Sequence, residues 1–113
     1  MEVKEMKAKE LTEAIGLSVL SMPEPDAEIS GAYAGDLLSW VMGRATEGNV
    51  WVTIMTNINM VAVASLAGIS LVILCDNSEI DDEVVKTASE KSINIVRTAL
   101  PMYEMCVKLA ERI

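Results

Sequence analysis

Short polar segments follow three apolar runs of the sequence, and they carry the side chains best suited to hold a small ligand. These segments are Thr56–Asn59, Asp76–Ser78 and Thr98–Ala99. Each precedes a stretch with helical spacing, so its backbone N–H groups should lie at the start of a helix, where an anion or a phosphate can bind. The same residue types are common helix caps. The segments therefore predict either a ligand site or a set of caps, and the sequence leaves both open.

The candidate ligand site extends to nine side chains, all of which could offer hydrogen bonds rather than catalysis. They are Tyr33, Asp36, Ser39, Thr56, Asn57, Asn59, Asp76, Asn77 and Thr98. In an open parallel sheet, ligands bind in the crevice outside the carboxyl ends of the strands. The prediction thus depends on a fold that gathers these residues at one edge of a sheet.

The sequence lacks the residue patterns of common catalytic and metal sites. It contains no histidine, which excludes His-based zinc sites, Ser–His triads and histidine general bases within this chain. Gly31–Gly35 has two glycines but neither the dinucleotide-binding nor the P-loop spacing. Asp76–Glu83 lacks the residue order of a calcium loop, and its last three carboxylates are expected in solvent. We expect no enzyme activity from this chain alone, no cofactor and no metal site.

An acidic balance limits the partners of the chain. Its 17 acidic and 9 basic side chains give a formal net charge of −8. Because nucleic-acid binding depends on clustered Lys and Arg, no nucleic-acid partner is expected. Near the amino end the basic residues alternate with acidic ones, which predicts a solvated helix face with a Glu5–Lys9 ion pair.

No segment is typical of export or of membrane insertion. The first ten residues are charged at every second or third position, unlike a signal peptide. The apolar stretch Asn59–Cys75 contains Ser65, Gly68 and Ser70 and is too short to span a membrane. We expect a soluble cytoplasmic protein with no membrane partner.

The two cysteines, Cys75 and Cys106, form no CxxC pattern. Cys75 ends an apolar run and Cys106 lies on the apolar stripe of a helix, so both are predicted to be small buried hydrophobic residues. Nothing in the sequence supports a disulfide between them.

The first half of the sequence predicts two helices and two short strands. Apolar spacing predicts a helix over Val3–Ile15, followed by strands at Leu17–Ser21 and Ile29–Ala34. Pro23–Asp26 forms the turn between the strands. Asp36 is the predicted N-cap of a second helix, which ends at Gly48–Asn49. Its apolar face is expected to hold Leu37, Leu38, Val41, Met42 and Ala45.

The second half predicts three strands that alternate with helices. The strands are Val50–Met55, Leu71–Cys75 and Ile93–Val96. Asn57 or Asn59 caps the helix that ends at Gly68, and Asp81–Glu83 place negative charge at the start of the next helix. Pro101 opens the last helix. Short strands that alternate with helices predict one α/β domain over residues 1–113, a mainly parallel sheet with flanking helices.

Several large apolar side chains could form a partner surface. We expect Trp40 and Trp51 to be exposed, and Met102 and Met105 of the last helix could also contact a partner, although core packing is the commoner explanation for such a stripe. A small chain with few aromatic residues gains by sharing apolar surface with a second copy. A homodimer is therefore expected.

Four segments together resemble the DRTGG domain family. They are Gly31–Ser39, Val50–Ile54, Asn59–Ala64 and the strand, acidic loop and helix that lead to Thr98. The similarity extends over nearly the whole chain and is greatest to the short stand-alone bacterial members, which are related to the N-terminal domain of HPr kinase. It implies an α/β regulatory module that has no catalytic activity of its own and tends to pair.

The sequence departs from this family at two places. Many members have Thr-Gly-Gly where this chain has Cys75–Asn77, and many have Pro where Ile80 stands. Loss of the glycines removes the residues that most easily adopt positive φ, and Asp76 would repel a phosphate. The kinase chemistry of HPr kinase does not carry over, because its P-loop lies in a domain that this sequence lacks.

We therefore expect a non-catalytic regulatory domain that binds a small ligand, anionic or a nucleotide, or a partner protein. The alternative is an accessory subunit of a larger phosphotransfer or redox enzyme complex. An independent enzyme is a third hypothesis.

Overall fold

The computed structural model describes residues 6–113, which form five helices and five strands. The helices are α1 (Ala8–Ile15), α2 (Leu38–Arg44), α3 (Ile58–Ala67), α4 (Asp82–Glu90) and α5 (Met102–Ala110). The strands are β1 (Ser18–Ser21), β2 (Ala32–Ala34), β3 (Val50–Thr53), β4 (Leu71–Leu74) and β5 (Ile95–Arg97). None of the described helices is long and apolar enough to cross a bilayer.

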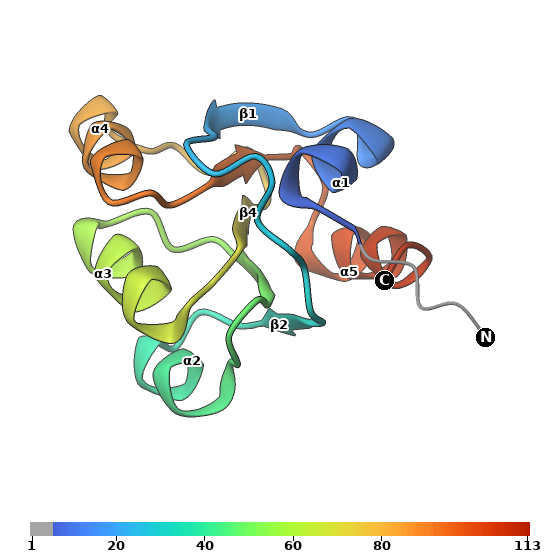
Figure 1. Cartoon of the computed structure of the whole chain (residues 1–113), viewed down its shortest axis with the longest axis horizontal. Helices are drawn as coiled ribbons and strands as arrows, with labels where there is room; N and C mark the ends of the chain where they lie inside the picture. The colour runs from blue at the N-terminus through green and yellow to red at the C-terminus, as the bar shows by residue number, and fades with distance from the viewer. Residues whose placement is uncertain (1–5) are drawn as a thin grey trace.

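The strands form one sheet in the order β1-β5-β4-β3-β2. β3, β4 and β5 are parallel, as predicted; β2 also pairs parallel to β3, and β1 joins the sheet antiparallel to β5. Helices α2, α3 and α4 cover one face of the sheet, and α1 and α5 cover the other (Figure 1). The predicted α/β architecture with flanking helices is confirmed.

Alternate strand residues supply the two halves of the core. Trp51, Val72 and Ile95 pack with α2, α3 and α4, whereas Val50, Ile73 and Val96 pack with α1 and α5. Every residue of β3 and β4 is buried, which is typical of parallel strands covered on both faces. The rigid centre of the sheet thus fixes the position of every loop that leaves it.

The first helix begins later than predicted. Of the predicted span, residues 3–5 lie outside the described residues, and Lys7 forms an isolated bridge with Glu28 instead of a helical turn. Ala8 and Lys9 also donate backbone hydrogen bonds to the turn at 25–27. Tertiary pairing therefore takes precedence over helix propensity at these positions.

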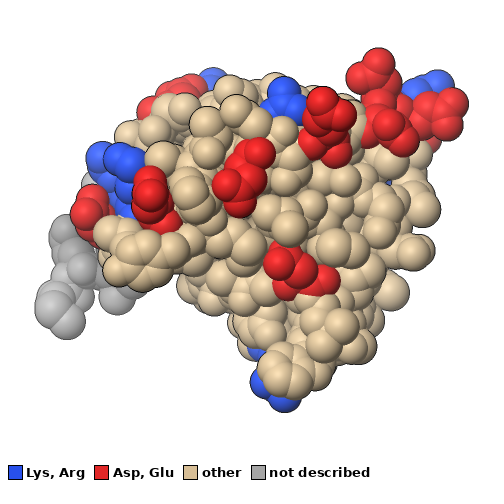
Figure 2. Space-filling view, turned by 180° about the vertical axis from the view of Figure 1, so that it is seen from behind, with Lys and Arg blue, Asp and Glu red and all other residues tan. Residues whose placement is uncertain are grey.

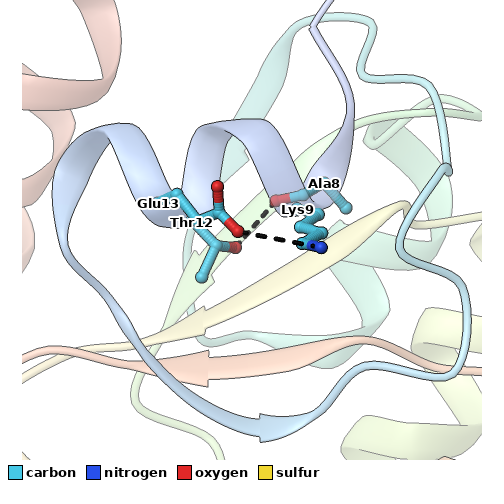
Figure 3. A network of polar contacts seen from close by, with 4 residues as sticks. All are labelled: Ala8, Lys9, Thr12 and Glu13. Atoms are coloured by element: carbon cyan, nitrogen blue, oxygen red, sulfur yellow. Dashed lines mark hydrogen bonds and ion pairs between the residues drawn. The ribbon is translucent and has the colours of Figure 1, made fainter.

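Two polar contacts run along α1 (Figure 3). The Thr12 hydroxyl donates to the Ala8 carbonyl at 2.7 Å, which satisfies a buried hydroxyl. Lys9 lies 3.9 Å from Glu13 on the solvent side. The predicted partner Glu5 lies outside the described residues.

The second helix differs from its prediction in cap and in face. Leu37 occupies the N-cap position, with no side-chain cap, because the Asp36 carboxylate is engaged elsewhere. Leu37 and Met42 are exposed, although the apolar spacing predicted them on the buried face. Val41 alone of this helix is fully buried, so a short helix at the edge of the sheet covers little core.

Two side chains predicted on a partner surface lie in the core instead. Trp51 is completely buried in the centre of β3, and its indole Nε1 donates to the Gly35 carbonyl at 2.8 Å. Met105 is buried against the sheet. Trp40 is exposed, as predicted, and the Arg44 guanidinium stacks 3.7 Å from the centroid of its ring.

The remaining strand boundaries shift by a few residues. The strand predicted from Ile29 begins at Ala32, the one predicted to Met55 ends at Thr53, and the one predicted from Ile93 begins at Ile95. Because β3 ends at Thr53, Ile54 and Met55 belong to the loop that leads to Thr56.

Two buried asparagines close the amino edge of the parallel strands. The Asn94 amide accepts from the Glu24 N–H at 2.9 Å and donates to the carbonyls of Glu24 and Ser70. The Asn49 amide likewise accepts from the Thr46 N–H at 2.9 Å and donates to the Ser30 carbonyl. Because these amides satisfy the backbone of the connecting loops, the amino edge is rigid.

Candidate functional site

The loops that follow β2, β3, β4 and β5 leave the sheet at one edge, because these strands are parallel. We call this the carboxyl edge. It contains Asp36 after β2, Thr56 and Asn57 after β3, Asp76 and Asn77 after β4, and Thr98 after β5. The three polar segments therefore lie at a single edge, as the sequence predicted.

The other three candidates lie farther from the strand ends. Tyr33 is the central residue of β2, and its half-buried ring packs against the core on the side of α2 and α3. Ser39 and Asn59 are exposed in the first turns of α2 and α3. Since both helices start at the carboxyl edge, Ser39 and Asn59 border it.

Asp36 connects the end of β2 with the end of β3. Its Oδ1 accepts a hydrogen bond from the Thr53 hydroxyl at 2.7 Å and another from the Ile54 N–H at 3.0 Å. Thr53 is completely buried, so the contact satisfies a hydroxyl that would otherwise be costly to bury. The role of Asp36 in the fold is to position two loops.

Two further candidates have structural hydrogen bonds. The Asn57 side chain accepts from the Met60 N–H at 3.2 Å and caps α3, which decides between Asn57 and Asn59 as the cap. The Thr98 hydroxyl accepts from the Leu100 N–H at 3.2 Å. For these residues the capping or turn interpretation holds.

The loops after β4 and β5 diverge, since α4 and α5 lie on opposite faces of the sheet. Such a divergence opens a crevice in doubly wound sheets. Here Asp76 N–H donates to the Leu100 carbonyl at 3.0 Å and Asn77 N–H to the Thr98 carbonyl at 2.9 Å. These backbone donors, which the sequence suggested for an anion, are used by the protein itself.

The region after β3 keeps more of its hydrogen-bonding capacity. Within residues 6–113, the side chains of Ser39, Thr56 and Asn59 form no hydrogen bond with another residue. Ser39 and Asn59 are exposed and Thr56 is half-buried. Polar side chains therefore remain available near the starts of α2 and α3, as do those of Asp76 and Asn77 after β4.

The backbone at Asp76 and Asn77 has positive φ angles of 57° and 50°. The expectation that loss of two glycines would remove this conformation is wrong. Asp and Asn are the non-glycine residues that adopt it most readily. The loop thus keeps a left-handed backbone while it presents two polar side chains to solvent.

The carboxyl edge carries negative charge close to Cys75. Burial, with smaller contributions from the neighbouring negative groups Cys106, Asp76 and Asp36, raises the pKa of the Cys75 thiol to about 11. Burial also raises the pKa of Cys106. Both cysteines are free thiols; Cys75 is buried, as predicted, and Cys106 is half-buried.

Arg97 is a residue of this edge that the sequence analysis missed. It ends β5, is half-buried, and donates from Nη1 to the Ser78 carbonyl at 3.4 Å. A basic residue directly after an apolar strand was the available signal. Arg97 places one positive charge beside the loop of Asp76.

Hollows of the surface lie elsewhere. The residues 24–31, 47–48 and 64–70 border hollows at the amino edge, and another lies between β2 and α5. None of the nine candidates lines them. Within residues 6–113, no group of three or more Cys, Asp or Glu side chains is placed to hold a metal ion.

Comparison with protein-family models and with curated proteins gives no match. Among solved structures, the chain is similar to the CBS and DRTGG domains of the regulatory region of Clostridium perfringens pyrophosphatase, a structure complexed with the activator diadenosine tetraphosphate. The TM-score is 0.65 at 13% sequence identity, and the match covers 86% of this chain but 43% of the other. This chain thus has a fold found in a regulatory region that contains CBS and DRTGG domains.

Proposed function

We propose that the chain is a non-catalytic regulatory domain that binds a small polar ligand, of the nucleotide class, at its carboxyl edge. The observation that supports this most is the gathering of polar loops from β2 to β5 on a rigid parallel sheet. The similarity in fold to a regulatory region with a bound dinucleotide activator favours the same class of ligand. Membership of the DRTGG family and a relation to HPr kinase belong to this proposal.

The ligand sits nearest to the starts of α2 and α3 in this proposal. Ser39, Thr56 and Asn59 offer hydroxyl and amide groups there that the fold does not use. Acidic Asp36 and Asp76 oppose a phosphate next to them, so they face the sugar or base of a nucleotide. Each of these side chains binds the ligand without taking part in a chemical reaction.

The test is a calorimetric titration with diadenosine tetraphosphate, ATP and AMP. Each neutral hydrogen bond lost from a bound ligand weakens binding about tenfold. We expect Asn59→Ala and Thr56→Ala to raise the Kd by about that factor with an unchanged melting temperature. Ser65→Ala is the matched control, because Ser65 lies on the same helix at the opposite edge of the sheet.

Two results would contradict the proposal. One is the absence of binding by the wild-type chain at millimolar concentrations of all three nucleotides. The other is binding that Ser65→Ala weakens and Asn59→Ala leaves unchanged, which would put the ligand at the amino edge.

Self-association is the second part of the proposal. Exposed apolar side chains, among them Leu37, Trp40 and Tyr103, lie on the surface of a chain of 12.2 kDa. Shared burial of such groups favours a homodimer.

A further inference from the structure

β2 lies at one edge of the sheet, and within residues 6–113 no strand pairs with its outer side. The Val50 N–H donates to the Gly31 carbonyl and the Gly35 N–H to the Val52 carbonyl, each at 3.0 Å. In a parallel ladder, alternate residues of a strand bond to the same neighbour. The backbone N–H and C=O groups of Ala32 and Ala34 therefore point away from β3, and both residues are exposed.

This edge is short, but it carries no charged or proline side chain that would prevent pairing with another strand. Natural edge strands carry Lys, Pro or bulges that block such pairing. Gly31–Gly35 contains no charged residue and no proline. Its open side is therefore able to accept a further strand.

The segment has the same sequence in both directions. Gly31–Gly35 reads Gly-Ala-Tyr-Ala-Gly, with Tyr33 at its centre. An antiparallel partner strand related by a twofold axis at Tyr33 puts Ala32 opposite Ala34 and Gly31 opposite Gly35. Each Ala32–Ala34 pair then exchanges both of its N–H···O bonds. A twofold axis requires such a self-complementary surface.

An apolar groove borders this strand on the face of α5. Its volume is about 330 Å³, and apolar side chains line it, including those of Ala34, Val52, Leu109, Ala110 and Ile113. An antiparallel pair across a twofold axis keeps each residue on its own face of the sheet. The α5 helices of two copies would thus approach each other over the joined strands.

We propose that the chain dimerises by antiparallel pairing of β2 with β2 of a second copy, which forms one continuous sheet. A second copy fits better than an unrelated partner because the strand is self-complementary. The edge and the groove also contain no charged side chain, so copies that each carry a charge of −8 meet at an uncharged surface. A stable interface needs about 800 Å² from each copy, so the dimer must cover the apolar groove beside α5 as well as the strand.

Disulfide cross-linking tests the register of this pairing. In the dimer, Tyr33 faces its symmetry mate as a non-hydrogen-bonded pair, with Cα atoms about 4.5 Å apart, a distance that a disulfide can span. We expect Tyr33→Cys in a Cys106→Ser background to form a covalent dimer under mild oxidation. Ala32→Cys is the control, because its symmetry mate lies two positions out of register and roughly 8 Å away.

Light scattering during size exclusion tests the surface without cross-linking. The wild-type chain at about 100 μM should elute with twice the 12.2 kDa of one copy. Ala34→Pro removes an N–H group that points away from β3, so the variant should retain its circular dichroism spectrum and elute as a monomer. Val19→Lys, a charge added on the opposite edge strand, should remain dimeric.

A monomeric wild-type chain at this concentration overturns the proposal, as does Ala34→Pro that remains dimeric. Cross-linking of Ala32→Cys in preference to Tyr33→Cys overturns the register. This inference rests on the proposed self-association and is independent of the proposed ligand site, because Ala34→Pro does not change Thr56 or Asn59. Nucleotide titration of the monomeric variant therefore distinguishes failure of one proposal from failure of the other.

Discussion

Cys75 is a buried thiol at the carboxyl edge with negatively charged neighbours. It extends the apolar run of β4 by one position, and its N–H donates to the Thr53 carbonyl at 3.0 Å. Its thiol is buried near Asp36 and Asp76, so ionisation would place a negative charge among negative neighbours. The side chain therefore behaves as a small apolar group at neutral pH.

This environment predicts a loss of stability in alkali. Burial and the nearby negative groups together raise the pKa of Cys75 from 9.0 to about 11, so the folded chain holds this proton more tightly than the unfolded chain. The protonated thiol contributes its full share of the unfolding free energy below pH 9, and this share is lost as the pH rises through 11. The unfolding free energy should fall by roughly 2 to 3 kcal/mol over that interval.

Urea denaturation of the wild type and of Cys75→Ala from pH 8 to pH 11.5 measures this effect. The difference in unfolding free energy between the two chains should shrink as the pH rises, because other groups titrate equally in both. A difference that stays constant would show that the thiol has the same pKa in the folded and unfolded states.

At the scale of the element, two helices end with the same hydrogen bonds but different residues. The Ile69 N–H donates to the Ala64 carbonyl after α3, and the Ile93 N–H donates to the Ala88 carbonyl after α4. The left-handed residue is Gly68 in the first case and Ser92, with a φ of 61°, in the second. Glycine adopts this conformation without strain, whereas serine does not.

Ser92→Gly should therefore stabilise the chain by about 1 kcal/mol, because it removes the strain of a side chain in the left-handed region. Ser89→Gly, three residues earlier inside α4, should destabilise it by roughly 0.5 kcal/mol. Thermal unfolding of the two variants measures both effects. If both substitutions stabilise the chain, or both destabilise it, this account of the helix end is contradicted.

The elements of the second half were the most predictable from the sequence. The run Leu71–Cys75 is continuously apolar, and the prediction of a strand buried on both faces was confirmed. Alternation with helices predicted parallel pairing of three strands, which was also confirmed. Local patterns succeed here because strand, cap and helix follow one another within short distances.

Elsewhere the local pattern did not contain the decisive contact. Asp36 has the residue type and position of an N-cap, but its carboxylate accepts a hydrogen bond from the hydroxyl of Thr53, which is distant in sequence. The apolar run of β1 gave no indication of its antiparallel direction. For the candidate site, the sequence predicted which segments gather at the carboxyl edge, but not that backbone bonds between the loops of Asp76 and Thr98 would use their donors.

At the scale of the whole molecule, charge acts against folding. The net charge is −8, acidic side chains are dispersed over the face seen in Figure 2, and within residues 6–113 a single ion pair joins Lys9 and Glu13, both exposed. Exposed pairs of this kind contribute little to stability. Repulsion among carboxylates is therefore larger than attraction at the surface.

Salt should raise the stability of the chain. An increase in ionic strength from about 0.01 M to 1 M shortens the screening length from about 30 Å to 3 Å and weakens repulsion between distant carboxylates. We expect a rise in melting temperature of a few degrees by calorimetry, equal for NaCl and KCl. A decrease would indicate that attractive pairs dominate, and a difference between the two salts would indicate specific ion binding.

The antiparallel pairing of β1 with β5 has a consequence for how the chain is made. Val19 lies opposite Val96 in the register of these strands, so the first of the five strands to be translated pairs with the last of the five. Closing so long a segment is slow compared with local pairing. The other four strands can pair in the order of their translation, whereas the docking of β1 completes the sheet only after β5 has been synthesised.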